Sequence, residues 1–398
     1  MNLLKLTIGA CALACLISSN VAYSVDCSTV NEYPNWTAKN WSGQFDHANT
    51  GDQMHYQNKL YKANWWTKAI PGSNQSWQYQ GTCSDPTTPK EGAYDKHGKL
   101  AVCGTKLCNK NNQPVQLRGM SSHGLQWYGL NTCLTEQSLD VLAYDWQADI
   151  LRISLYVQEG GYETDPVGFT AQVNTLIAMA SDRGMYALVD WHQLSPGDPN
   201  HNTELAKQFF TDIVTHNKHR DNVLYDIANE PNNVAWLGIR DYASEIIPVI
   251  RTIKNDAIVL VGTHGWATFG ASDGGTLQEV IDNPIPFDNI MYTFHFYAAS
   301  HLEFYRTRLD SASDVLPVFV TEWGSQKYTG DGDNDFISTQ SYIDLMKRKK
   351  ISWTNWNYSD DMRSGAVWQQ GTCRTSNFSD SQLKEAGSWV KQQILLGR

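Results

Sequence analysis

The chain has 398 residues, of which 41% are hydrophobic, and its formal net charge is -10. A chain of this length can bury a large core and hold more than one domain. The acidic balance and the lack of a basic run argue against nucleic acid as a partner. The 15 Trp and 19 Tyr residues, set against an 18% charged fraction, suit either the stacking of sugar rings or a large aromatic core.

Residues 1–24 have the pattern of a secretory signal peptide. Lys5 gives a positive start, residues 6–18 form an apolar stretch, and residues 22–24 (Ala-Tyr-Ser) form a small-x-small cleavage site. This stretch is too short to be a membrane span, and no later stretch could span a bilayer. We therefore expect a secreted, extracellular protein, although Cys15 leaves open a lipid-anchored form at the outer surface.

Residues 25–83 are rich in Trp and Tyr and poor in aliphatic side chains. Such a segment cannot build an ordinary core and needs a covalent staple. Cys27 and Cys83 lie at its two ends and are the expected disulfide pair. Short strands separated by Gly and Asn turns are predicted between them. Residues 84–92 are polar and contain two Pro, which is typical of a short linker.

Two motifs in this segment resemble the family 5/12 carbohydrate-binding modules. They are Asn-Trp-Ser-Gly at residues 40–43 and Tyr-x-x-x-x-Tyr-x-Ala-x-Trp-Trp-Thr at residues 56–67. The resemblance implies a flat aromatic face that stacks on polysaccharide, with Trp41, Trp65 and Trp66 in it. One of the two adjacent Trp residues is also expected to pack in the core. Cellulose and chitin both fit such a face, and the sequence leaves the choice open.

Residues 93–398 alternate apolar strand-like runs with helical patterns. The alternation implies right-handed crossovers and a parallel sheet, and eight units fit a (β/α)₈ TIM barrel better than an open sheet. No Gly-x-Gly-x-x-Gly follows the first strand, which argues against a dinucleotide-binding fold. The strand-like runs begin near Val115, Ile150, Met185, Val223, Ile258, Ile290, Leu316 and Ile351.

Two of these strands carry a glutamate where they end. Glu230 closes the fourth strand, which Pro231 stops, and Glu322 closes the seventh. Because the carboxyl ends of barrel strands meet at one mouth, the two glutamates should face each other. Carboxyl groups about 5–5.5 Å apart suit a retaining glycosidase, whereas about 6.5–9.5 Å suits an inverting one. One must be protonated and the other ionised.

Other strand ends supply partners for this pair. Arg152 is placed to keep the nucleophilic glutamate ionised, and Asn229 could bind the 2-OH of a sugar. His295 and Tyr297 could orient the two carboxylates. Asp190 and Trp323 are assigned to packing. We assign the other histidines to the surface, namely His47, His55, His97, His201, His216, His219 and His301.

Four motifs in the second segment resemble the bacterial endoglucanase branch of glycoside hydrolase family 5. They are residues 118–127 (RGMSSHGLQW), 189–192 (VDWH), 223–231 (VLYDIANEP) and 321–324 (TEWG). The resemblance implies that Glu230 is the acid/base and Glu322 the nucleophile. It also implies shared active-site roles for Arg152, Asn229, His192, His295, Tyr297 and Trp356.

The same resemblance assigns contacts with substrate. Relatives often place a Lys near position 361, but here the loop reads Ser-Asp-Asp-Met-Arg over residues 359–363, so Arg363 is the candidate substitute. His192 could instead hold the surroundings of the nucleophile, and Trp266 could be a sugar platform or loop core. The full set of expected substrate-binding residues is His123, Trp127, Tyr128, Tyr156, His192, Trp266, Trp356 and Arg363.

The remaining cysteines suggest two further disulfides, because an even number in an exported chain favours disulfides over metal or redox chemistry. Cys103 and Cys108 could pair across a lead-in hairpin. Cys133 follows the first barrel strand and Cys373 follows the eighth, so a bridge between them would tie the barrel where it closes. Four cysteines also allow other connectivities.

These inferences predict a secreted, monomeric endo-β-1,4-glucanase. It would hydrolyse internal β-1,4-glucosidic bonds of cellulose by double displacement, with retention and without a metal or other cofactor. A mannanase, chitosanase or mixed-linkage glucanase on the same scaffold is the enzymatic alternative, since a fold alone does not set the substrate. A polysaccharide-binding adhesin or scaffold is the alternative outside the enzymes.

Overall fold

A computed structural model describes residues 24–57, 59–83, 91–127 and 129–397 of the chain. Residues 1–23 of the expected signal peptide, Cys15 among them, most of the expected linker and Tyr128 lie outside the described residues. The chain divides into two compact units, residues 1–90 and residues 91–398. Each unit is described by itself.

The first unit is built of short strands. Its sheet has five strands in the order β1-β7-β6-β5-β2, and β3 pairs with β4 in a separate hairpin. A small core of Ala48, Met54, Ala63 and Trp77 is covered by the sheet, and the Cys27–Cys83 disulfide packs beside Leu60. The strands are β1 Ser24–Val25, β2 Asn31–Glu32, β3 Ala38–Lys39, β4 Phe45–His47, β5 Gln53–Tyr56, β6 Lys59–Ala63 and β7 Trp77–Cys83.

Three tryptophans of this unit lie at its surface. Trp41 is fully exposed, and Trp65 and Trp66 are 51% and 54% exposed. The expectation that one of the adjacent pair packs in the core is therefore wrong. Trp77, together with small side chains, fills the core instead, and its indole N–H donates to the carbonyl of Ala69 at 2.8 Å.

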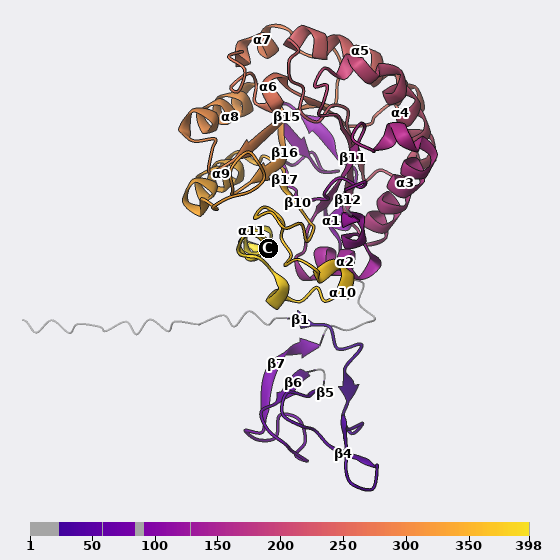
Figure 1. Ribbon diagram of the computed structural model, residues 1–398, viewed down its shortest axis with the longest axis vertical. Coiled ribbons are helices and arrows are strands. Elements are labelled where there is room, and N and C mark those ends of the chain that lie inside the picture. The colour runs from indigo at the N-terminus through magenta and orange to yellow at the C-terminus, as the bar shows by residue number, and fades with distance from the viewer. Residues whose placement is uncertain (1–23, 58, 84–90, 128, 398) are drawn as a thin grey trace, which may run out of the picture. The chain divides into compact units, whose positions relative to one another are not determined.

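The second unit is a closed barrel of eight parallel strands, with helices around the strands (Figure 1). The barrel closes where β10 pairs with β17, with Arg118 opposite Trp353. The predicted TIM barrel is confirmed. The barrel strands are β10 Arg118–Ser121, β11 Ile150–Tyr156, β12 Tyr186–His192, β13 Val223–Asp226, β14 Val259–Gly262, β15 Ile290–Tyr297, β16 Val318–Gly324 and β17 Trp353–Trp356.

Helices follow the strands, and a hairpin of β8 Ala101–Cys103 and β9 Lys106–Cys108 precedes the barrel. The helices are α1 Ala93–His97, α2 Glu136–Asp140, α3 Pro166–Asp182, α4 Thr203–Asn217, α5 Trp236–Ile253, α6 His264–Ala267, α7 Leu277–Asp282, α8 Glu303–Val315, α9 Phe336–Lys349, α10 Thr372–Thr375 and α11 Glu385–Leu395. Shorter turns are η1 Leu130–Cys133, η2 Val141–Asp145, η3 Tyr162–Thr164, η4 Pro199–Asn202 and η5 Asp380–Gln382. Across the described residues, none of these helices has the length and apolar character of a membrane span.

The barrel interior changes character along the strands. At the amino-terminal end an apolar cluster including Leu188 and Leu224 fills it. Side chains on a strand alternate between its two faces, so Asp190 and Asp226, two residues further on, also point inward. The outward side chains, such as Val189 and Tyr225, pack in the larger core beneath the helices. The fold therefore places polar groups at one end of the barrel interior, next to a packed apolar layer.

Two more disulfides belong to this unit. Cys103 and Cys108 bridge the β8–β9 hairpin, and Cys133 and Cys373 join η1 to α10. Because η1 follows β10 and α10 follows β17, the second bridge spans the two strands that close the barrel. These pairings are the ones that the order of the cysteines suggests.

Candidate active site

A cleft of about 1140 Å³ lies at the carboxyl end of the barrel strands. At one end it is lined by Trp266 and Ser272, which follow β14, and at the other by Trp127, which follows β10, and by Arg374 of α10. It contains most of the site residues that the sequence suggested. These are His123, Trp127, Tyr156, His192, Glu230, Trp266, His295, Tyr297, Glu322, Trp356 and Arg363.

The two glutamates meet in this cleft. One carboxylate oxygen of Glu230, one of Glu322 and a ring nitrogen of His295 all lie within 4.8 Å of one another. Glu322 lies in β16, where it is opposite His295 of β15. Strand β13 ends at Asp226, earlier than the sequence suggested, so Glu230 stands on an extended segment beyond it.

Backbone contacts fix that segment. Ile227 and Asn229 donate their N–H groups to carbonyls of the neighbouring strands β14 and β12, at 3.0 and 3.3 Å. Gly262 lets the segment pass close to β14, because a Cβ at that position would lie 2.0 Å from the carbonyl oxygen of Ala228. Glu230 is therefore held firmly although it lies outside regular secondary structure.

Arg152 lies directly beneath the cleft and is fully buried. Its Nη1 donates to Oε2 of Glu322 at 2.9 Å, and its Nη2 lies 2.9 Å from Oδ2 of Asp190 and donates to Oδ1 of Asn229 at 2.6 Å. Burial opposes the charge of the guanidinium, but the neighbouring carboxylates outweigh burial and raise the pKa of Arg152 above its ordinary value. The hydroxyl of Tyr297 donates to the other oxygen of Glu322 at 2.6 Å. Both oxygens of Glu322 thus accept a hydrogen bond, one of them from a guanidinium.

Glu230 has different surroundings. Its Oε1 lies 2.8 Å from Nδ1 of His295, whose Nε2 lies 2.8 Å from the hydroxyl of Thr321. Burial raises the pKa of Glu230 to about 7. Burial also lowers the pKa of His295 to about 3, so its ring is neutral and adds no positive charge beside Glu230. Glu230 can therefore hold a proton near neutral pH while Glu322 accepts from a guanidinium.

The assignment of Asp190 to packing is corrected by its contacts. Asp190 is fully buried, forms the ion pair with Arg152 and lies 2.7 Å from Nδ1 of His192. Nε2 of His192 is then free to accept from Nδ2 of Asn229 at 3.2 Å. Asp226 is also fully buried, and burial and the charge of Asp190 raise its pKa well above the ordinary range. Because Asp226 is neutral, the positive charge of Arg152 has two buried carboxylates to balance, those of Asp190 and Glu322.

Aromatic rings wall the cleft around His192. Its ring stacks with Tyr156 at 4.1 Å and with Trp356 at 5.4 Å between ring centroids. His123 packs against Trp356 at 5.3 Å, and Trp127 meets Tyr156 edge to face at 6.1 Å. Of the two alternatives for His192, its contacts with Asp190 and Asn229 fit a positioning role, and its place in the cleft lining is also compatible with sugar contact.

Trp266, in α6 after β14, also lines the cleft. It is 38% exposed and adopts a left-handed backbone conformation with φ of 58°. Its backbone N–H donates to the carbonyl of Pro231 at 3.0 Å, which ties its loop to the segment that carries Glu230. An exposed ring in the cleft argues against the loop-core alternative, and the role of Trp266 as a sugar platform stays a prediction.

His301 was not expected in the site, and its assignment to the surface is wrong. It lines the cleft, stacks on Tyr305 at 4.2 Å and accepts from the backbone N–H of Tyr297 at 3.1 Å. The sequence offers one indication that His301 belongs to the site, namely that it follows the last residue of β15, Tyr297, by four positions. His47, in the first unit, is buried, so its assignment to the surface is wrong as well. Other cleft residues that were not expected include Glu159, from the loop after β11, Tyr305 of α8 and Arg374 of α10.

Two groups have the spacing of metal ligands among the described residues, and neither suits a metal centre. Glu230, His295 and Glu322 form one, but the fixed positive charge of Arg152 beside Glu322 disfavours a second cation there. Cys133, Asp360 and Cys373 form the other, but their sulfurs are joined to each other and cannot act as thiolates.

The fold and this pair of carboxylates define a (β/α)₈ glycoside hydrolase. Residues 108–362 match the model of the cellulases of glycosyl hydrolase family 5, and residues 24–84 match that of a cellulose-binding domain. The chain belongs to glycosyl hydrolase family 5.

Characterised relatives share much of this sequence. Endoglucanase MaCel5A of Microbulbifer sp. strain ALW1 is 54% identical over 375 residues, which cover 86% of this chain and 73% of that protein. Endoglucanase E-5 of Thermobifida fusca is 54% identical over 315 residues, which cover 79% of this chain and 66% of the relative. The chain thus spans about two thirds of the length of the second relative.

Solved structures agree with the fold. The crystal structure of the catalytic domain of Thermobifida fusca endoglucanase Cel5A (E5) has a TM-score of 0.75 and 54% identity. The match covers 76% of this chain and 99% of the chain in that crystal structure. A variant of that domain in complex with cellotetraose has the same TM-score and 53% identity.

We predict that Arg152→Met strongly destabilises the barrel, because it leaves Asp190 and Glu322 buried without a countercharge. Breaking a buried ion pair in this way costs about 3–5 kcal/mol. Denaturant unfolding of the full chain would measure the loss. Arg348→Met is the control, since Arg348 pairs with Asp310 at the surface, at 3.5 Å, and should cost about 1 kcal/mol or less. Equal losses in the two variants would contradict the account of the site.

Proposed function

We propose that the chain is a secreted endo-β-1,4-glucanase that cleaves cellulose with retention of anomeric configuration, with Glu230 as acid/base and Glu322 as nucleophile. The observation that carries this proposal is a pair of carboxylates within 4.8 Å of each other in opposite electrostatic surroundings. Oxygens this near to each other favour the closer spacing of a retaining glycosidase over the wider spacing of an inverting one. Retention is also typical of family 5.

In the first step Glu322 attacks the anomeric carbon while Glu230 protonates the leaving oxygen. The proton is available because burial keeps the pKa of Glu230 near 7. The guanidinium of Arg152 and the hydroxyl of Tyr297 donate to the two oxygens of Glu322 and fix its orientation. Asn229 is held between Arg152 and His192, and its amide nitrogen carries a second hydrogen that could donate to the 2-OH.

In the second step the now ionised Glu230 takes a proton from water, and the water attacks the glycosyl-enzyme ester. Glu322 leaves as a carboxylate, which Arg152 and Tyr297 stabilise again. The same residue serves as acid and then as base, as reversal of the first step requires. The neutral His295 beside Glu230 supports both states, because it can donate to the carboxylate or accept from the carboxylic acid.

The first unit would hold the enzyme on insoluble polysaccharide. Its match to a cellulose-binding domain and the three exposed tryptophans support cellulose as the ligand, and the same rings could also stack on chitin. We further propose that residues 25–83 and 93–398 are the two functional domains, that residues 1–24 direct secretion, and that the protein acts as a monomer. The two compact units and the family matches over residues 24–84 and 108–362 support the proposed domain bounds.

The proposal predicts different losses in Glu230→Gln and Glu322→Gln. On carboxymethylcellulose Glu230→Gln should lose about 10²–10⁴-fold in rate, because the leaving oxygen needs a proton. It should still release a rapid burst of dinitrophenol from an aryl β-cellobioside, whose leaving group needs no acid, and then turn over slowly because the base of the second step is missing. Glu322→Gln should fail on both substrates, and Glu303→Gln, an exposed glutamate of α8, should match the wild type. Activity of Glu322→Gln on either substrate would refute the assignment.

The tryptophan face can be tested in the full chain. Replacing Trp41, Trp65 and Trp66 with Ala should weaken binding to microcrystalline cellulose about 10-fold or more, because exposed aromatic rings supply most of the contact area. Hydrolysis of carboxymethylcellulose should be unchanged. Parallel binding assays on chitin would decide between the two ligands. Equal loss of activity on insoluble and soluble substrate would contradict separate roles for the two units.

A further inference from the structure

One wall of the cleft has almost no regular structure of its own. It consists of residues 357–374, here called the rim segment, which run from the end of β17 into α10. The rim segment supplies Asp361, Arg363 and Arg374 to the lining of the cleft. A loop of this length needs specific ties to hold charged side chains in place.

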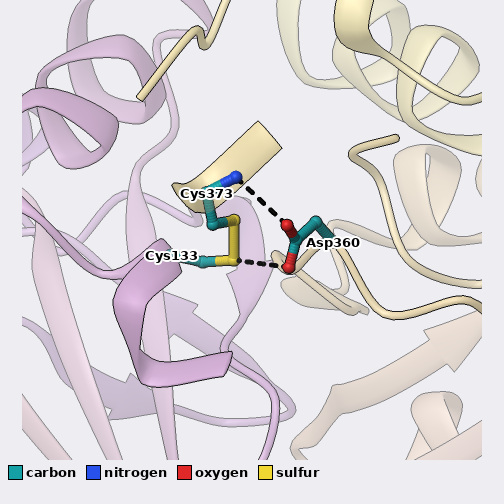
Figure 2. A group of neighbouring side chains, drawn as sticks. All are labelled: Cys133, Asp360 and Cys373. Atoms are coloured by element: carbon teal, nitrogen blue, oxygen red, sulfur yellow. Dashed lines mark hydrogen bonds between the residues drawn. A yellow bond between two sulfur atoms is a disulfide. The ribbon is translucent and has the colours of Figure 1, made fainter. Parts of the chain in front are cut away.

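Asp360 closes the rim segment on itself. Its Oδ2 accepts the backbone N–H groups of Gly371 at 3.0 Å and of Cys373 at 3.1 Å. Its Oδ1 lies 3.5 Å from Sγ of Cys133, a contact rather than a hydrogen bond because a disulfide sulfur carries no proton. Figure 2 shows the carboxylate of Asp360 turned toward the disulfide and the backbone of Cys373. One side chain thus joins the two ends of the rim segment.

The Cys133–Cys373 disulfide then fixes this closed loop to η1, on the other side of the barrel seam. Both cysteines are buried, with 0% and 4% of their surface exposed. Lys384, just before α11, adds a third tie because its ammonium donates to the backbone carbonyls of Asp361 and Arg363. All three ties act on the backbone and leave the rim side chains free to face the cleft.

The rim side chains lie away from the reacting pair. Asp361 is 3.7 Å from Nε2 of His123, and none of the hydrogen bonds or ion pairs of Glu230 and Glu322 described above involves the rim segment. A displaced rim segment should therefore change how substrate is held and leave the bond-breaking groups as they are.

We propose that Asp360 is a positioning residue that, with the Cys133–Cys373 disulfide, presets the rim segment for substrate and thereby sets affinity for the sugar units bound there. This inference rests on the proposed function. A preset wall spares the substrate the cost of ordering the loop on binding. Arg363 can act in place of a substrate-binding Lys only because the loop that carries it is fixed.

The test compares KM and kcat of Asp360→Ala, Asp360→Asn and the wild type on aryl β-glycosides of two, three and four glucose units. Asp360→Ala should raise KM about 10-fold on the longest substrate, with kcat within about 2-fold. Asp360→Asn retains an oxygen that can accept both backbone N–H groups and should restore KM. Asp380→Ala, an exposed acid outside the rim segment, is the control and should match the wild type.

A second variant tests the same inference if Asp360→Ala misfolds. Cys133→Ser combined with Cys373→Ser should raise KM in the same way and leave kcat unchanged, and it decides the question if Asp360→Ala does not fold. An unchanged KM, or a fall in kcat alone, would overturn the inference. If the wild type does not cleave these glycosides, the proposed function fails instead, so the two failures are distinguishable.

Discussion

The buried charge of Arg152 is the interaction on which the rest of the site depends. A guanidinium that is fully removed from water loses hydration worth several kcal/mol and is tolerated only with close partners. Here the partners are Glu322, Asp190 and Asn229, which come from three different strands or strand ends. The barrel must therefore place these elements correctly before the charge can be buried. The position of Glu322 is a consequence of that requirement.

The same arrangement separates the two catalytic carboxyl groups. Glu322 accepts hydrogen bonds from a guanidinium and a phenol, whereas the carboxyl group of Glu230 contacts a histidine that burial keeps neutral. Two identical side chains a few ångströms apart thus lie in unlike electrostatic surroundings, as their two roles in double displacement require. Asp190 contributes indirectly, since it holds both Arg152 and His192.

Much of this could be predicted from the sequence because the barrel repeats one rule. Polar residues at the ends of apolar strands converge at one mouth, so Glu230, Glu322, Arg152 and Tyr297 could be placed together from their order alone. The order of Cys133 and Cys373 suggested a bridge across the seam for the same reason.

What the sequence did not indicate depends on contacts without periodicity. Asp190 resembles a packing residue until Arg152 is found beside it. His301 reaches the cleft because the chain turns back after β15, and Asp360 acts through backbone groups more than ten residues away. Loop geometry of this kind follows from three-dimensional packing and leaves no pattern in the residues themselves.

The most direct test of the central claim is the pH dependence of kcat/KM on a soluble cello-oligosaccharide. Because Glu230 must be protonated to act as the acid and its pKa is about 7, kcat/KM should fall as pH rises through about 7. The same enzyme acting on a dinitrophenyl β-cellobioside should not show this fall, since that leaving group needs no proton. A profile for the oligosaccharide that stays flat well above pH 7, or the same alkaline loss on both substrates, would contradict the account.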